Sequence, residues 1–220
     1  MEPTYLAGAI VVLLFSVILH EVMHGLAALY FGDHTAERAG RLTLNPLPHI
    51  DPIGTILVPA LFLLPSLFGG GGGFIIGWAK PVPVNPLNFT NIRRGEFFVS
   101  LAGVASNFTL AILAALLYHL LAATAVNPLI PALLSFTATM NLILGVFNLF
   151  PLPPLDGSKI LLSQLPTRLA IQYEKLERYG LFLILILWFV PIGGVPILSL
   201  IMSVIVSSLG GLLGIPLRLF

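Results

Sequence analysis

The sequence predicts an all-α polytopic membrane protein with about six membrane segments. Of 220 residues, 57% are hydrophobic and only 9% are charged, whereas a soluble domain carries about 25% charged residues. Apolar runs recur along the chain, at 3–31, 53–68, 96–123, 130–150, 179–190 and 195–213. We therefore expect a single membrane-embedded domain over 1–220, with a core at about 3–160 and additional C-terminal transmembrane helices at about 179–213.

Local signals define the elements in chain order. No basic region and no small-residue cleavage site accompany the run at 3–31, so it is expected to be a retained helix that stops at Gly32. Alternating residues at 40–44 predict a short β element. The prolines at 79–86 exclude a helix or a buried strand. We expect that stretch to be a re-entrant or interfacial loop packed on the helices near the active site.

The distribution of charge predicts the orientation and excludes one class of partner. The net charge is +1, which argues against nucleic acid, and the absence of Cys excludes thiolate chemistry. If residues 53–78 enter the membrane and return, all ten Lys and Arg residues lie on one face. Basic loops stay in the cytoplasm, so we expect the N-terminus to lie outside.

The most informative motif is His-Glu-Val-Met-His at 20–24, inside the first apolar run. His20 and His24 lie on one helical face and can bind the same Zn²⁺. Glu21 is placed to act as general base on a zinc-activated water. The pattern alone occurs by chance in many proteins. Inside a membrane helix, however, ionisable groups are costly and usually mark a site.

A catalytic zinc site needs a third protein ligand, and Asp156 is the best candidate. It follows the fourth apolar run, after the proline-rich stretch at 151–154. On spacing alone, a ligand and an ordinary Asp-Gly turn are equally compatible with this position. His49 and Asp51 are the alternatives for the third ligand, although we expect His34, His49 and Asp51 to belong to a solvated loop.

Two motifs together carry a family resemblance. Residues 20–24, joined to Asn-Leu-Phe-Pro-Leu-Pro-Pro-Leu-Asp-Gly at 148–157, resemble the site-2 protease family of intramembrane zinc metalloproteases. The stretches 41–46 and 77–85 are similar to its compact prokaryotic branch, which has no PDZ or regulatory domain. The resemblance covers about 16–160. It implies that Asp156 is the third ligand of one Zn²⁺ per chain.

Two asparagines are further candidates. The family carries Gly-Pro-x-x-Asn between its zinc motifs, and here Gly103 and Asn107 match while Val104 replaces the proline. Asn148 lies eight residues before Asp156. Either asparagine could stabilise the oxyanion or hold substrate, and either could instead join helices by hydrogen bonds. We favour the oxyanion or substrate role for Asn148 and the packing role for Asn107.

The resemblance implies a zinc-dependent intramembrane endopeptidase that cleaves within or near the transmembrane helices of membrane-protein substrates, in regulated intramembrane proteolysis. Its expected partners are a substrate helix and the lipid bilayer, and residues 40–44 and 81–85 are candidates to clamp an unwound substrate. We expect a multi-pass protein of a prokaryotic inner (cytoplasmic) membrane, with the active site toward the cytoplasm. The alternative is a non-proteolytic zinc-binding membrane protein, such as a metal carrier or a helix-binding chaperone.

Overall fold

Three long apolar helices form the frame of the molecule. The computed structural model describes residues 3–57, 79–122, 124 and 127–216. The long helices are α1 (Pro3–Tyr30), α4 (Ile92–Ala122) and α5 (Leu129–Asn148), with 28, 31 and 20 residues. At about 1.5 Å per residue, each is long enough to cross a hydrocarbon layer of about 30 Å. Three of the predicted spans therefore form helices whose ends lie within a few residues of expectation.

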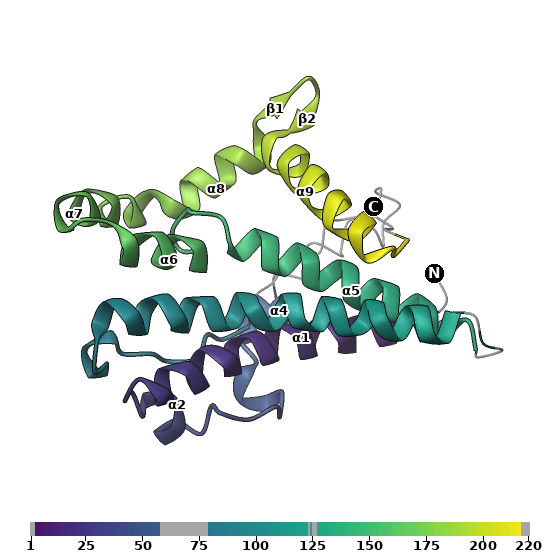
Figure 1. Cartoon of the computed structure of the whole chain (residues 1–220), viewed down its shortest axis with the longest axis horizontal. Helices are drawn as coiled ribbons and strands as arrows, with labels where there is room; N and C mark the ends of the chain where they lie inside the picture. Colours follow the sequence, from purple (N-terminus) through teal and green to yellow (C-terminus); the bar gives the residue numbers. More distant parts are fainter. Residues whose placement is uncertain (1–2, 58–78, 123, 125–126, 217–220) are drawn as a thin grey trace.

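The long helices lie side by side, and α4 packs against both α1 and α5 (Figure 1). Small residues allow this close approach. On α4 the buried residues include Ala111, Ala114 and Ala115, and Ala138 of α5 packs against them. A Cβ placed at Gly145 of α5 would come within 3.1 Å of a ring on α4, that of Phe108. Such small residues are typical of helix contacts inside membranes, where packing rather than the hydrophobic effect drives association.

Short elements gather where α1 ends and α4 begins (Figure 1). The chain leaves α1 through Gly32, whose φ of +99° is a conformation that favours glycine. Among the described residues, the short elements between the two long helices are α2 (Thr35–Arg38), η1 (Leu47–His49), η2 (Pro52–Leu57) and η3 (Pro86–Asn88). Most of the predicted excursion at 53–78, from residue 58 onward, lies outside the described residues.

The strand predicted at 40–44 does not form. These residues make a turn and bends, and Gly40 adopts a φ of +63°. Side-chain hydrogen bonds, rather than strand pairing, connect this segment to its neighbours. The buried Arg41 donates from Nη2 to the carbonyls of Lys80 and Pro81, at 2.6 and 3.3 Å, while the Thr43 carbonyl accepts a 2.9 Å bond from Nε2 of His49.

The described strands lie instead near the C-terminus. After α5 the chain forms α6 (Asp156–Gln164), α7 (Thr167–Glu174), η4 (Glu177–Tyr179), α8 (Gly180–Phe189), β1 (Pro191–Ile192), β2 (Val195–Pro196) and α9 (Ile197–Leu213). β1 and β2 pair antiparallel, with Ile192 opposite Val195. Their turn uses Gly193 and Gly194, both at positive φ, as tight hairpins require.

The last two predicted spans form one bent path rather than two separate crossings. α8 has 10 residues, about 15 Å. It begins at the end of the bundle that carries α6, where a Cβ at Gly180 would overlap the Pro153 carbonyl. α9 finishes at the opposite end, where the Leu213 carbonyl accepts a 2.7 Å bond from Nε2 of His119 on α4. The hairpin stands at the bend between α8 and α9 (Figure 1).

Candidate metal centre

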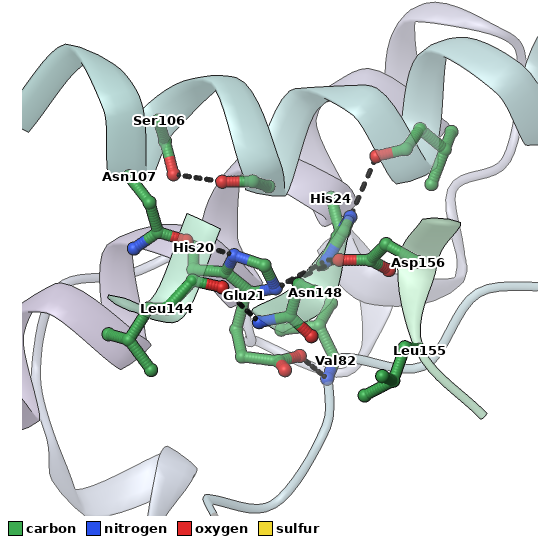
Figure 2. Close-up of polar contacts among 12 residues, drawn as sticks. His20, Glu21, His24, Val82, Ser106, Asn107, Leu144, Asn148, Leu155 and Asp156 are labelled. Atoms are coloured by element: carbon green, nitrogen blue, oxygen red, sulfur yellow. Dashed lines mark hydrogen bonds and ion pairs between the residues drawn. The ribbon is translucent and has the colours of Figure 1, made fainter. Parts of the chain in front are cut away.

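The structure brings His20, His24 and Asp156 together at one point inside the bundle (Figure 2). The two histidines lie one turn apart on α1, and Asp156 is the first residue of α6. The two Nε2 atoms are 2.9 Å apart, and Oδ2 of Asp156 lies 3.2 Å from Nε2 of His20 and 3.3 Å from Nε2 of His24. Residues far apart in the sequence thus present three ligand atoms to one small volume.

Two glycines make this convergence possible. A Cβ at Gly103 of α4 would overlap the His24 ring and lie 2.8 Å from Cε1 of His20, so only glycine leaves room for both imidazoles. A Cβ at Gly157 would overlap the Leu149 carbonyl. Gly157 therefore allows the start of α6 to fold back onto the end of α5, as the sequence predicted. This close approach holds Asp156 against α1.

Hydrogen bonds fix the tautomer of each imidazole. Nδ1 of His24 lies 2.7 Å from the carbonyl of Val99, which can only accept, so Nδ1 carries the proton. Nδ1 of His20 likewise lies 2.7 Å from Oδ1 of Asn107. In its neutral form, each ring then directs the lone pair of Nε2 toward the other ring and toward Asp156.

Three electron-rich atoms facing one another require a cation between them. Oδ2 of Asp156 is buried and receives no hydrogen bond. Either an imidazolium proton or a metal ion can fill this role. The spacings of 2.9–3.3 Å match the separation of about 3.3 Å between ligand atoms placed tetrahedrally around zinc at about 2.0–2.1 Å. The donor set of two imidazole nitrogens and one carboxylate oxygen also suits zinc. The residues present therefore fit a zinc ion.

Glu21 lies next to the metal cluster and is held by the backbone of a distant segment. Its Oε2 accepts a 2.7 Å hydrogen bond from the N–H of Val82 (Figure 2). The Val82 side chain is buried, and a Cβ at Gly25, one turn after Glu21, would come within 3.0 Å of it. Val82 therefore docks on α1 through both its side chain and its amide.

Residues 80–85, here called the proline strap, are fixed at both ends. At the first end the N–H of Lys80 donates to the His49 carbonyl at 2.9 Å, in addition to the bonds from Arg41. At the other end the N–H of Asn85 donates to Oδ2 of the buried Asp33 at 2.7 Å. These bonds hold the segment across α1 beside Glu21, which agrees with the predicted loop packed on the helices.

Asp33 anchors the strap as a carboxylate. Burial raises the pKa of Asp33, but the hydrogen bonds from the Asn85 N–H, the Asn88 side chain and Thr35 outweigh this effect and hold the pKa below its ordinary value. The ionised form is therefore the one that the fold stabilises. Nothing in the sequence motifs marked this residue as an anchor.

The remaining candidates have other partners. His49 is buried rather than solvated, and Nε2 donates to Thr43. His34 is exposed beside Glu37, whereas Asp51 accepts bonds from the N–H groups of residues 53 and 54. Neither His49 nor Asp51 joins the only candidate metal cluster found within the described ranges, which consists of His20, His24 and Asp156.

The two asparagines occupy different positions. Asn148 is drawn among the site residues in Figure 2, and its Nδ2 donates to the Leu144 carbonyl of its own helix at 3.0 Å. Asn107 is fully buried and accepts from His20, so it contacts the candidate ligand directly as well as joining helices. Sequence reasoning missed Asn141, which bonds to Asn107 at 2.9 Å. The sequence signal that could have identified Asn141 was a strongly polar amide within an apolar helix.

The fold and site define a membrane-type helical bundle with a candidate metal cluster and an adjacent carboxylate. Residues 122–190 match the family model described as Peptidase family M50. The chain is also 37% identical over 190 residues to "Putative zinc metalloprotease YwhC" of Bacillus subtilis (strain 168), covering 84% of this chain and 81% of that protein. The chain belongs to peptidase family M50, which confirms the resemblance to the site-2 protease family.

A second relative covers most of both chains. The chain is 31% identical over 200 residues to Rip2 of Mycobacterium tuberculosis (strain ATCC 25618 / H37Rv), which carries the same zinc metalloprotease description. That match spans 87% of this chain and 71% of Rip2. Solved structures give no significant match.

Proposed function

We propose that this M50 peptidase is a zinc-dependent intramembrane endopeptidase that hydrolyses peptide bonds within or near the transmembrane helices of membrane-protein substrates. The observation that carries the proposal is the convergence of His20, His24 and Asp156 inside an apolar bundle, with Glu21 alongside. Zinc held by these three residues supplies Lewis-acid activation of a water molecule. The zinc metalloprotease descriptions of YwhC and Rip2 support the same chemistry.

Glu21 is the residue assigned to proton transfer. It takes a proton from the attacking water and returns it to the leaving amine. The Val82 N–H engages Oε2, so we assign the proton to Oε1. The hydrogen bond also limits rotation of the carboxylate, which keeps it directed at the site.

Asn148 is the residue assigned to the substrate carbonyl. An amide nitrogen carries two N–H groups, and Asn148 uses one of them on the Leu144 carbonyl. The other is left to donate to the oxygen that gains charge during attack, the role of an oxyanion hole.

The proline strap is the segment that we expect to hold substrate. A peptide bond in a helix is internally hydrogen-bonded, so the substrate must unwind before attack, and an extended edge can bind the unwound chain. The strap lies beside Glu21. Residues 40–44 form no strand, so the clamp is assigned to 81–85 alone.

The charge distribution supports the proposed placement in the membrane. The described basic residues belong to α2, the start of α4, α6, α7 or the segments beside these elements, which Figure 1 draws at one end of the bundle: Arg38, Arg41, Lys80, Arg93, Arg94, Lys159, Arg168, Lys175 and Arg178. The positive-inside rule places this end in the cytoplasm and the N-terminus outside. We therefore propose a prokaryotic inner membrane protein whose site faces the cytoplasm.

The test uses purified wild type and Glu21→Gln in lipid vesicles, with a pool of labelled single-span peptides as the probe and mass spectrometry of the products. Wild type is expected to cleave members of the pool, to lose cleavage on chelation and to regain it with zinc. Glu21→Gln is expected to bind about one zinc per chain yet cleave about 10²- to 10⁴-fold more slowly. The exposed Glu37→Gln is the matched control and should cleave normally.

Two results would contradict the proposal. Cleavage by Glu21→Gln at the wild-type rate would exclude Glu21 as the base. A wild type that binds zinc but cleaves no peptide of the pool would favour the non-proteolytic alternative, a metal carrier or a helix-binding chaperone.

A further inference from the structure

A chain of buried polar side chains extends from His20 into the apolar part of the bundle. Asn107 on α4, Asn141 on α5 and Ser16 on α1 are each at most 1% exposed. Together they connect the three long helices through consecutive hydrogen bonds: Asn107 to Asn141 at 2.9 Å and Asn141 to Ser16 at 2.8 Å. Buried amides are costly unless their hydrogen bonds are made. Here the hydrogen bonds run in series from Ser16 through Asn141 and Asn107 to His20 in the candidate metal centre.

The backbone determines the direction of every bond in this chain. Nδ2 of Asn141 lies 2.9 Å from the carbonyl of Thr137, which can only accept. Ser16 donates its own proton to the Val12 carbonyl at 2.8 Å, so its Oγ accepts the second N–H of Asn141. The Oδ1 of Asn141 is then left to accept from Nδ2 of Asn107.

This order fixes the state of His20. Because Nδ2 of Asn107 is used on Asn141, Oδ1 of Asn107 faces His20 and accepts from Nδ1 at 2.7 Å. A flipped Asn107 amide would instead place its Oδ1 against Oδ1 of Asn141, two acceptors with no proton between them. The arrangement therefore admits the imidazole with its proton on Nδ1, which leaves the Nε2 lone pair for a metal. His24 needs no such series of side chains, because the Val99 carbonyl accepts directly from its Nδ1 and so determines its tautomer.

We propose that Asn141 and Ser16 are positioning residues of the metal centre, which act through Asn107 to hold His20 as an Nε2 ligand. This inference rests on the proposed zinc site. It differs from simple helix packing because it predicts that residues without metal contact set the metal affinity. Partners of metal-bound histidines are worth about 10- to 100-fold in affinity.

The test is a zinc titration of detergent-purified, metal-free protein against a competing chelator dye. Asn141→Leu removes the amide at similar volume and is expected to weaken zinc binding about tenfold. Ser16→Ala leaves the Thr137 carbonyl to orient the amide, so its loss of affinity is expected to be smaller. Thr139→Val is the matched control, because Thr139 is buried on the same helix and bonds only to the Ser135 carbonyl in its own helix. It should bind zinc as wild type does.

A spectroscopic readout separates positioning from packing. ¹⁵N chemical shifts of the histidine rings in the metal-free protein report which nitrogen is protonated. Wild type and Thr139→Val are expected to show His20 protonated at Nδ1, and Asn141→Leu is expected to show a mixture of tautomers. Wild-type zinc affinity together with a single Nδ1 tautomer in Asn141→Leu would overturn the inference and leave a packing role.

The zinc titration distinguishes the proposed metal centre from the proposed positioning role of Asn141 and Ser16. The wild-type titration tests the metal centre itself, and absence of zinc binding there would overturn both proposals. The ratio of variant to wild-type affinity tests only the positioning chain. If Asn141→Leu does not fold, Asn141→Ala decides, because it also removes the amide: wild-type affinity and a single Nδ1 tautomer in that variant would overturn the inference.

Discussion

The positions of the two histidine rings in the candidate metal centre depend on the absence of a side chain at Gly103. The imidazoles of His20 and His24 pack directly on the backbone of α4 at Gly103, where no side chain stands between them. His24 is fixed from one side by the Val99 carbonyl. The position of both ligand nitrogens is therefore sensitive to one missing methyl group on a facing helix.

Gly103→Ala is expected to impair the metal centre. The added Cβ overlaps the His24 ring, and overpacking of this kind typically costs about 1–3 kcal/mol. Zinc content per chain after dialysis should fall, and thermal stability with zinc present should fall with it. Gly211→Ala is the control, because a Cβ there meets nothing within 4 Å. Equal zinc retention in both variants would show that the rings can move away at little cost.

At the scale of elements, the proline strap depends on an anchor outside the metal site. Asp33 follows α1 and receives bonds from the strap and from η3. Because these bonds favour the carboxylate, the pKa of Asp33 lies below its ordinary value. A lowered pKa gives a stabilisation that is present above the unfolded-state value of about 4 and is lost as the pH falls through the folded-state value.

Asp33→Asn is therefore expected to lower the melting temperature at neutral pH, because hydrogen bonds to charged groups contribute about 1.5–3 kcal/mol. The difference between variant and wild type should shrink as the pH falls below about 4. Thermal unfolding of the metal-free protein in detergent, measured from pH 7 to pH 3, checks this. Glu37→Gln, in an exposed pair with His34, should change little. A gap between Asp33→Asn and wild type that widens toward acid would contradict the role assigned to Asp33.

The sequence predicted those elements that depend on local patterns. Uninterrupted apolar runs located the three long helices, and helical periodicity placed His20 and His24 on one face. The strand at 40–44 failed because Arg41 bonds to carbonyls about 40 positions away, which alternation cannot reveal. Hydropathy also counted α8 and α9 as separate spans, since it does not register a bend. The partners of Asn141 come from other helices and were likewise beyond sequence reasoning.

At the scale of the whole molecule, the two ends of the bundle differ in charge and in which chain termini they carry. α1 begins and α9 finishes at the end opposite α2 and α6 (Figure 1). Because α8 and α9 traverse the bundle once, the end of α9 lies at the same end of the bundle as the start of α1.

Cysteine labelling of intact cells tests this topology, and the natural absence of Cys makes each introduced thiol unique. Asn127→Cys, between α4 and α5, and Pro216→Cys, after α9, are expected to react with a membrane-impermeant maleimide. Lys175→Cys, after α7, should react only once the membrane is opened. Labelling of Lys175→Cys alone in intact cells would reverse the proposed orientation. Opposite behaviour at positions 127 and 216 would contradict the single traverse of α8 and α9.

The position of Asp156 gives a bound metal a mechanical role. His20 and His24 belong to the first helix, whereas Asp156 follows more than a hundred residues later in the chain. A metal ion joining them acts as a removable cross-link that closes a very long loop, and its binding free energy adds to the stability of the fold. Chelation would therefore remove the metal-mediated link between α1 and α6 as well as empty the site. An enzyme with a zinc ion at this site would lose part of its tertiary framework on losing the metal.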